Sequence, residues 1–117
     1  MKLLILPLAI LVSSCSLLDT SFYDDNESML AVEVRHEVQN LTCDPVYSLG
    51  VAQSVDKLYL YTESKKSKDV HKLVTLMKET SDGLYEKENP STFYCKIKKE
   101  LLQKQSKELA NAIMRRY

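Results

Sequence analysis

The sequence predicts an all-α fold: a small up-down bundle of three to four helices, joined by one disulfide. Three observations favour this class. The 117 residues include only 2 glycines and no tryptophan, while Lys, Glu, Leu and Gln are abundant, a composition that suits helices better than turn-rich β folds. Apolar residues recur at helical spacing in separate segments. Two of the 3 cysteines, Cys43 and Cys95, lie beside the predicted helix ends.

The N-terminal residues have a pattern of their own. Lys2 precedes an apolar run over residues 3–12, too short to span a roughly 30 Å hydrocarbon core but suited to the hydrophobic region of a signal peptide. The run ends in Val12-Ser13-Ser14-Cys15, which resembles the bacterial lipobox. The resemblance implies that residues 1–14 are a cleaved signal peptide and that Cys15 carries a diacylglycerol and an N-acyl chain. An ordinary signal peptide with a chance cysteine, or an uncleaved anchor, is the alternative.

The residue after the lipobox bears on location. In bacteria with an outer membrane, an Asp after the lipidated cysteine favours retention at the inner membrane, and this chain has Ser16. The resemblance therefore implies an anchor in the outer membrane, facing the periplasm. In a bacterium without an outer membrane, the same signal implies the outer face of the cell membrane. Several acyl chains, at about 0.8 kcal/mol per buried methylene, make such an anchor effectively permanent.

Residues 16–27 are polar and acidic, and predict a flexible tether between Cys15 and a domain over residues 28–117. Extended, residues 16–27 reach at most roughly 40 Å. Phe22 and Tyr23 interrupt the polar run, and we expect them to pack on the domain or to lie at the lipid interface.

The first two helices are predicted from periodicity and capping signals. Residues 28–42 form the first, although Val32-Glu33-Val34 also alternates like a strand; its apolar face holds Leu30, Val34, Val38 and Leu41. Asp44-Pro45 reads as an N-cap followed by a proline at the first helical position. A second helix is therefore expected from there to Glu63, with an apolar face made by Tyr47, Val51, Val55, Leu58 and Tyr59.

The last two helices follow the same logic. The third helix starts near Lys68. Gly83 lowers the helix propensity near its end. Its predicted inward face is made by Leu73, Leu76, Met77, Thr80 and Leu84. Asn89-Pro90 repeats the signal of a cap followed by proline. The fourth helix then runs from Ser91 almost to the end of the chain, with an inward face made by Ile97, Leu101, Leu102, Leu109 and Ile113.

The cysteines predict one disulfide. With Cys15 assigned to lipid, Cys43 and Cys95 remain as a pair in an oxidising compartment. In the chain-entropy model, the bond would stabilise the folded domain by roughly 4 kcal/mol, because it closes a loop in the unfolded chain. In an up-down bundle it would join two turns at the same end. A reactive thiol or a metal site is the alternative, but His36 and His71 are not at ligand-like spacing from a cysteine.

The same topology separates two ends of the domain. Opposite the disulfide, near the tether, five bases would cluster, namely Lys65, Lys66, Lys68, Arg115 and Arg116. They would rest on anionic headgroups, or they are ordinary solvated charges. The disulfide end would project away from the membrane and is the natural place for a partner to bind.

Charge and motifs bound the function. Residues 16–45 are acidic and residues 91–117 basic, so we expect them to pair across the bundle; a basic strip that binds a polyanion is the alternative. The net charge is +0, so no nucleic-acid partner is expected. No phosphate loop, metalloprotease or nucleophile motif occurs. We therefore expect no enzyme, and no metal or cofactor besides the covalent lipid.

Two features together resemble a known group. They are the lipobox followed by the acidic, aromatic residues 22–27, and the segment Phe93-Tyr94-Cys95-Lys96-Ile97-Lys98 with an earlier cysteine before Pro45. They resemble small lipoproteins of tailed phages, particularly phages of marine bacteria. That group implies no known activity and no catalytic residues.

The expected function is a membrane-anchored periplasmic lipoprotein that acts as a binding module in the cell envelope. Its partner would be an envelope protein that it masks or inhibits. One alternative is the outer-membrane subunit of a spanin lysis complex. Short spanin lipoproteins tend to be proline-rich, whereas residues 15–117 hold only Pro45 and Pro90. The other alternative is a structural envelope lipoprotein.

Overall fold

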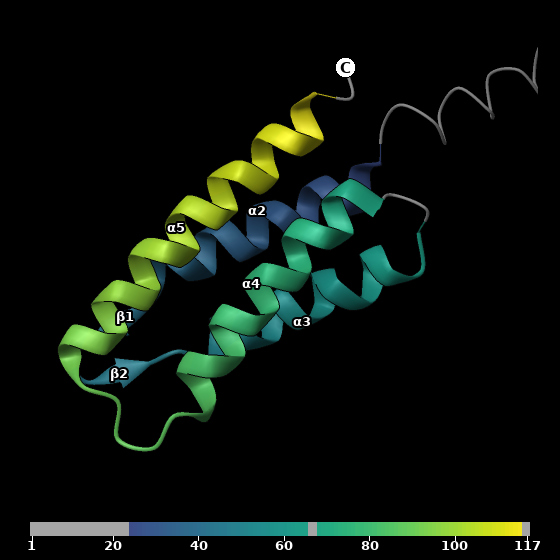
Figure 1. The fold of residues 1–117 in the computed structure, drawn as a ribbon. Coiled ribbons are helices and arrows are strands. Elements are labelled where there is room, and N and C mark those ends of the chain that lie inside the picture. The colour runs from purple at the N-terminus through teal and green to yellow at the C-terminus, as the bar shows by residue number, and fades with distance from the viewer. Residues whose placement is uncertain (1–23, 66–67, 116–117) are drawn as a thin grey trace, which may run out of the picture.

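Four helices and one hairpin make up the domain (Figure 1). The computed structural model describes residues 24–65 and 68–115, and its elements in order are α2 (Asp25–Asn40), β1 (Thr42–Cys43), β2 (Val46–Tyr47), α3 (Leu49–Glu63), α4 (Lys68–Glu86) and α5 (Thr92–Met114). Successive helices alternate in direction and pack on one another, and α2 also packs on α5, which closes the bundle. The predicted all-α bundle is confirmed.

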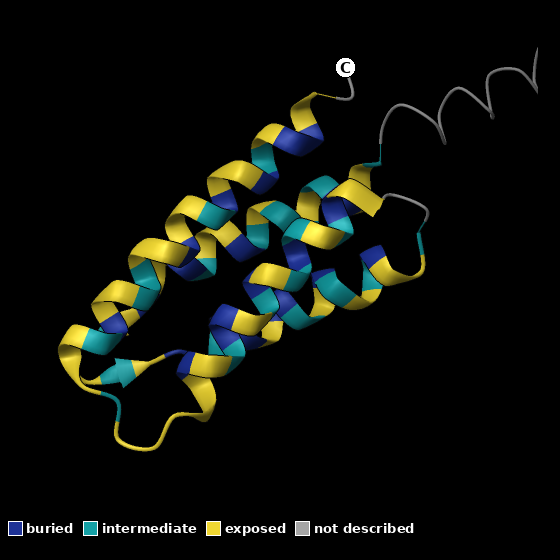
Figure 2. Cartoon of the chain, viewed as in Figure 1, coloured by how far each residue is buried: buried dark blue, intermediate teal, exposed yellow. Residues whose placement is uncertain are grey.

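The core runs along the axis of the bundle, and all four helices contribute to it (Figure 2). Its fully buried residues on the predicted apolar faces include Val34, Val38, Val51, Val55, Leu58, Met77, Leu102 and Leu109. On α4, Val70 and Val74 are also fully buried, although the predicted inward face of that helix did not include them. Burying such a side chain contributes about 1.5–3 kcal/mol relative to leaving it exposed. This shared interior is what holds the four amphipathic helices together.

The first helix begins earlier than predicted. Asp24 is its N-cap, and its side chain accepts a hydrogen bond of 3.0 Å from the backbone N–H of Glu27. Glu27 is only 1% exposed, so both residues belong to the domain and not to the tether. The predicted boundary at Ser28 is therefore wrong, and no more than residues 16–23 separate Cys15 from the domain. Cys15 and residues 16–23 lie outside the described residues.

Asp44-Pro45 does not start a helix. The two residues form the turn of a short antiparallel hairpin, in which Thr42 pairs with Tyr47 and Cys43 with Val46. The Asp44–Pro45 peptide bond is cis. Asp and Pro favour tight turns as well as helix starts, and here the turn is formed. The second helix, α3, starts only at Leu49.

The last helix starts one residue later than predicted. Ser91 is its N-cap, and its hydroxyl accepts a hydrogen bond of 3.0 Å from the backbone N–H of Tyr94. Pro90 therefore precedes the cap. Asn89 adopts a φ of 48° in the connection from α4, a left-handed conformation that Asn tolerates better than most residues.

Several residues predicted to face the core are exposed instead. Tyr47 lies on the hairpin, Leu76 on α4, and Ile97 and Leu101 on α5. The apolar residues of α5 span more of its circumference than its neighbours cover, because the buried side is already filled by Cys95, Leu102, Ser106, Leu109, Ala112 and Ile113. The surplus apolar residues define a second, outward face.

Candidate functional site

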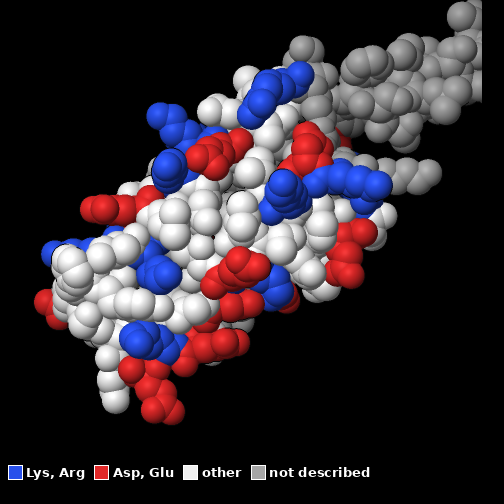
Figure 3. Space-filling model, in the orientation of Figure 1, with Lys and Arg blue, Asp and Glu red and all other residues white. Residues whose placement is uncertain are grey.

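The outward apolar residues of α4 and α5 form the most extended apolar surface that we identify on the described residues. Phe93, Ile97 and Leu101 are spaced i, i+4 and i+8 on α5, so they lie along one side of the helix. They are 74%, 47% and 38% exposed, and Leu76 on α4 is 46% exposed. We call these four residues the α4–α5 apolar face. Figure 3 shows uncharged surface over α4 and α5 on this side of the molecule.

Hydrogen bonds between the two helices hold this face together. The side-chain amide of Gln105, one turn after Leu101, donates to Thr80 Oγ1 (3.1 Å) and to the carbonyl oxygen of Leu76 (3.5 Å). Nearer the disulfide, the Tyr94 hydroxyl donates to the carbonyl oxygen of Gly83 (3.5 Å). The face is therefore carried by two helices whose relative position is fixed at both ends.

Charged side chains border the face. Lys96, Lys104 and Glu100 are exposed on α5, and Lys104 forms no ion pair in the described residues. The predicted pairing of the basic C-terminal segment with the acidic N-terminal one is wrong for the described residues. The ion pairs there include Lys57 of α3 with Glu33 of α2, Lys65 just after α3 with Asp24, the N-cap of α2, and Lys78 of α4 with Asp56 of α3. The lysines of α5 are left to solvent or to other contacts.

The disulfide end adds aromatic side chains next to the face. Tyr47 and Tyr85 are exposed and border a hollow of about 330 Å³ that Leu84 and Pro90 also line. The ammonium groups of Lys87 and Lys98 lie 4.9 and 5.4 Å from the centre of the Tyr94 ring. Cation–π contacts of this kind contribute about 0.5–1 kcal/mol at exposed sites and help to hold the Tyr94 ring in place.

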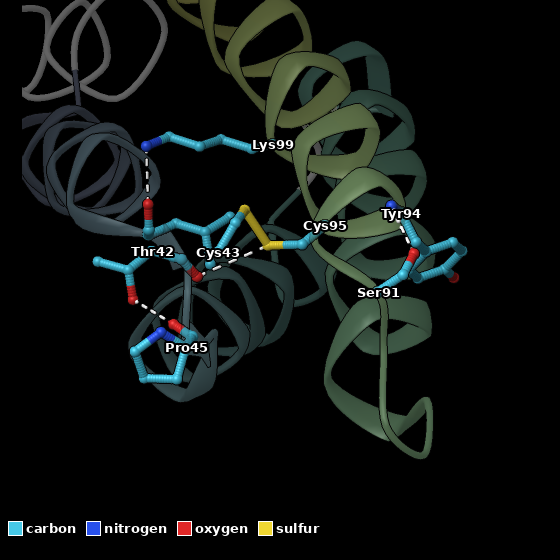
Figure 4. The surroundings of a disulfide bond; sticks show 8 residues. Thr42, Cys43, Pro45, Ser91, Tyr94, Cys95 and Lys99 are labelled. Atoms are coloured by element: carbon cyan, nitrogen blue, oxygen red, sulfur yellow. Dashed lines mark hydrogen bonds between the residues drawn. A yellow bond between two sulfur atoms is a disulfide. The ribbon is translucent and has the colours of Figure 1, made fainter.

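The predicted disulfide between Cys43 and Cys95 is confirmed, with an S–S distance of 2.13 Å (Figure 4). It joins the hairpin to the first turn of α5. The Cys95 sulfur lies 3.6 Å from the carbonyl oxygen of Thr42, a contact and not a hydrogen bond, because a disulfide sulfur carries no hydrogen. The Thr42 hydroxyl donates to the carbonyl oxygen of Pro45 (3.0 Å) and closes the turn. The start of the α4–α5 apolar face is thus covalently fixed.

Of the predicted basic cluster, Lys65, Lys68 and Arg115 lie in the described residues, and their surroundings differ. Lys65 pairs with Asp24 and lies 3.9 Å from the Glu27 carboxylate, so acidic residues of the domain already neutralise its charge. The Tyr61 hydroxyl donates to the same Asp24 carboxylate (2.8 Å). Arg115 caps α5, and its side chain donates to the carbonyl oxygen of Asn111 (3.4 Å). Lys68 begins α4 and is exposed. Lys66 and Arg116 lie outside the described residues.

The histidines take part in local contacts. His36 is exposed and lies 3.0 Å from the side-chain amide of Asn40. His71 is half-buried: its Nδ1 lies 3.0 Å from Thr62 Oγ1, and its ring lies 5.0 Å from that of Tyr59. Within residues 24–65 and 68–115, no group of three His, Cys, Asp or Glu side chains is placed to hold a metal ion.

Sequence reasoning missed the α4–α5 apolar face because it assigned Leu76, Ile97 and Leu101 to the core. The available signal was the number of apolar residues on α5, which exceeds what one buried stripe needs. None of the helices in the described part of the chain is long and apolar enough to cross a membrane. No protein-family profile, curated protein or solved structure matches this chain.

Proposed function

We propose that this protein is a lipid-anchored envelope protein that binds a protein partner through the α4–α5 apolar face. The lipobox ending at Cys15 supports the anchor, and the Cys43–Cys95 disulfide suits an oxidising compartment. Ser16 favours the periplasmic side of the outer membrane. The proposal assigns no catalytic residue and no cofactor besides the covalent lipid.

The observation that carries the binding role is the exposure of Phe93 and Ile97 beside a filled core. Exposed apolar patches with a polar rim mark interaction sites on folded proteins. Aromatic residues are enriched where partners bind most tightly, and Phe93 is the most exposed large hydrophobic residue among those described. The neighbouring Tyr85 and Tyr47 extend the same kind of surface.

The rim favours a protein over a lipid surface or a nucleic acid. Lys96 and Lys104 alternate along α5 with Glu100 and Glu108, so both signs of charge border the apolar residues. An anionic bilayer or a polyanion would meet both acids at close range, and like-charge contacts oppose such binding. A protein can match both signs with complementary side chains.

Site-specific photo-crosslinking tests the binding role in the lipidated, full-length protein in intact envelopes. A crosslinking amino acid at Ile97 should capture one defined envelope protein. The same amino acid at Leu60, which is 58% exposed on α3, is the matched control and should not. Phe93→Ser should reduce capture from position 97 by about tenfold or more, the size of effect expected for an interface anchor. Equal capture from positions 60 and 97, or none from 97, would overturn the role.

A separate experiment tests the anchor. Cys15→Ala should abolish fatty-acid labelling and membrane retention, because the thiol is the acceptor of the diacylglycerol. The Cys43–Cys95 bond should persist, since neither cysteine pairs with Cys15. Retained labelling in this variant would refute the lipid anchor. It would not affect the conclusion from crosslinking, which tests the binding role separately.

A further inference from the structure

A second apolar surface lies on a different seam of the bundle, between α2 and α5. It is a groove of about 140 Å³ at the end of the domain where α2 begins. Small side chains on both helices leave the space, among them Ala31 and Ala110, and the larger Val32 and Met114 border it. Val32 and Met114 are 67% and 65% exposed, so nothing in the described part of the chain covers them. Figure 1 shows the start of α2 and the end of α5 together at this end.

We propose that Phe22, in the segment between Cys15 and the domain, occupies this groove. An apolar cavity of about 150 Å³ accommodates benzene, so the groove has room for one aromatic ring. Phe22 is one of only 2 phenylalanines in the chain, and the other, Phe93, is on α5 at the disulfide end. Burying an aromatic ring that would otherwise be exposed to water favours docking.

The length of the chain allows the contact. Phe22 is two residues before Asp24, which an extended backbone spans in about 7 Å. Ser28, at the near end of the groove, lies about 6 Å along the helix axis from Asp24, at roughly 1.5 Å per residue. A chain that turns back at Asp24 therefore brings Phe22 beside Ser28 without extra length.

The charges of Asp19 and Arg35 also favour a path of residues 16–23 along the groove. Arg35 lines the far end of the groove, about 16 Å along the axis from Asp24, and forms no ion pair in the described residues. Asp19 is five residues before Asp24, within an extended reach of about 17 Å. A segment that enters the groove at Phe22 thus directs its acidic residue toward the one basic side chain of the groove.

Docking would shorten the distance between the domain and its anchor. With Phe22 held, only residues 16–21 separate Cys15 from the fixed part of the chain, a reach of about 20 Å. This consequence rests on the proposed lipid anchor, whereas the docking of Phe22 does not. The domain would then stay close to the membrane.

Methionine oxidation in the full-length protein tests the proposal, since oxidation depends on exposure of the sulfur. Met114 borders the groove, Met29 is 70% exposed outside it, and Met77 is fully buried in the core. After a brief hydrogen peroxide treatment of envelopes, mass spectrometry gives the rate at which each of these three methionines is oxidised. With Phe22 docked, Met114 should oxidise several-fold more slowly than Met29. In Phe22→Ser the two rates should agree within about twofold, and in Phe22→Leu the rate at Met114 should lie between.

The other residues make the result interpretable. Met77 should stay protected in all three proteins, which shows that the core is intact, and Leu60→Ser should leave the Met114 rate unchanged. Equal rates at Met114 and Met29 in the unsubstituted protein would overturn the proposal. So would protection of Met114 that survives Phe22→Ser, because a bilayer, a partner or a second copy would then be the cover.

Discussion

The ammonium group of Lys99 donates a hydrogen bond of 2.7 Å to the carbonyl oxygen of Leu41, the C-cap residue of α2 (Figure 4). This bond places a positive charge at the negative end of the α2 dipole. It also ties α5 to α2 one turn beyond the disulfide, so two contacts of different chemistry fix the same corner of the bundle.

Lys99→Met should therefore destabilise the domain. The variant keeps the aliphatic stem but loses a charge-assisted hydrogen bond, which contributes about 1.5–3 kcal/mol, and leaves the Leu41 carbonyl without this donor. We expect a loss of about 1–2 kcal/mol in the free energy of unfolding, measured by urea denaturation. Lys104→Met is the control, since Lys104 is exposed and should change stability by less than about 0.5 kcal/mol. Equal effects of the two substitutions would contradict the role of Lys99.

Removing the disulfide should have a larger effect. Cys43→Ser combined with Cys95→Ser releases the constraint on the intervening loop, and the loss of such a bond from a small domain costs about 2–5 kcal/mol. The midpoint of urea denaturation should fall accordingly. A reducing agent should produce the same fall in the unsubstituted protein and none in the double variant. A reductant effect that persists in the double variant would point to another origin.

The two glycines should respond differently to alanine. A Cβ at Gly83 would meet no atom within 4 Å. Because alanine favours a helix over glycine, Gly83→Ala should raise stability by about 0.5–1 kcal/mol. A Cβ at Gly50 would instead overlap the carboxylate of Glu37, which lies against the first turn of α3.

Gly50→Ala must therefore displace the Glu37 side chain. That side chain is flexible at its end, but its negative charge is favourably placed near a helix N-terminus, where such a charge contributes about 0.3–1 kcal/mol. We expect thermal denaturation to show a smaller gain for Gly50→Ala than for Gly83→Ala, or a loss. In a Glu37→Gln background the two alanine variants should become more alike. A gain at Gly50 as large as that at Gly83 would contradict the close approach of Glu37.

The ion pairs of Lys78 should make the stability of the domain depend on pH in the alkaline range. Its hydrogen bonds to the carboxylates of Asp82 (2.9 Å) and Asp56 (3.1 Å) raise its pKa above the usual 10.5. A raised pKa means that the folded state holds the proton more tightly than the unfolded state. The stabilisation is therefore complete below pH 10.5 and disappears as the pH rises through the folded-state pKa.

Lys78→Met should remove this dependence. At pH 7 the variant should be less stable by up to about 1 kcal/mol, because these ion pairs are partly exposed. The difference between the two proteins should shrink as the pH is raised past 10.5, measured by urea denaturation at a series of pH values. Comparing the two proteins cancels the titration of the tyrosines, which both share. A difference that stays constant with pH would rule out Lys78 as its source.

Local signals in the sequence identified most of the helices. The apolar spacing of Val34 and Val38, and of Val51 and Val55, placed these residues in the core, and both pairs are buried. The third helix was predicted to start near Lys68, where α4 begins. The assignment of Cys15 to lipid left Cys43 and Cys95 as the disulfide pair, and this pair forms. The helices depend on periodicity and capping, which act over a few residues, whereas the disulfide joins cysteines 52 positions apart and was inferred from residue chemistry alone.

Tertiary structure decided what those signals left open. Asp44-Pro45 is compatible with a helix start or a turn, and the hairpin formed there brings Cys43 to Cys95. Leu76, Ile97 and Leu101 have the spacing of core residues, yet they are exposed. Four helices around one axis bury only one stripe of each, so the position of the neighbours, and not the apolar character of a residue, selects which side is covered. The sequence by itself determined a disulfide-linked helical bundle, whereas packing determined which apolar residues remain on its surface.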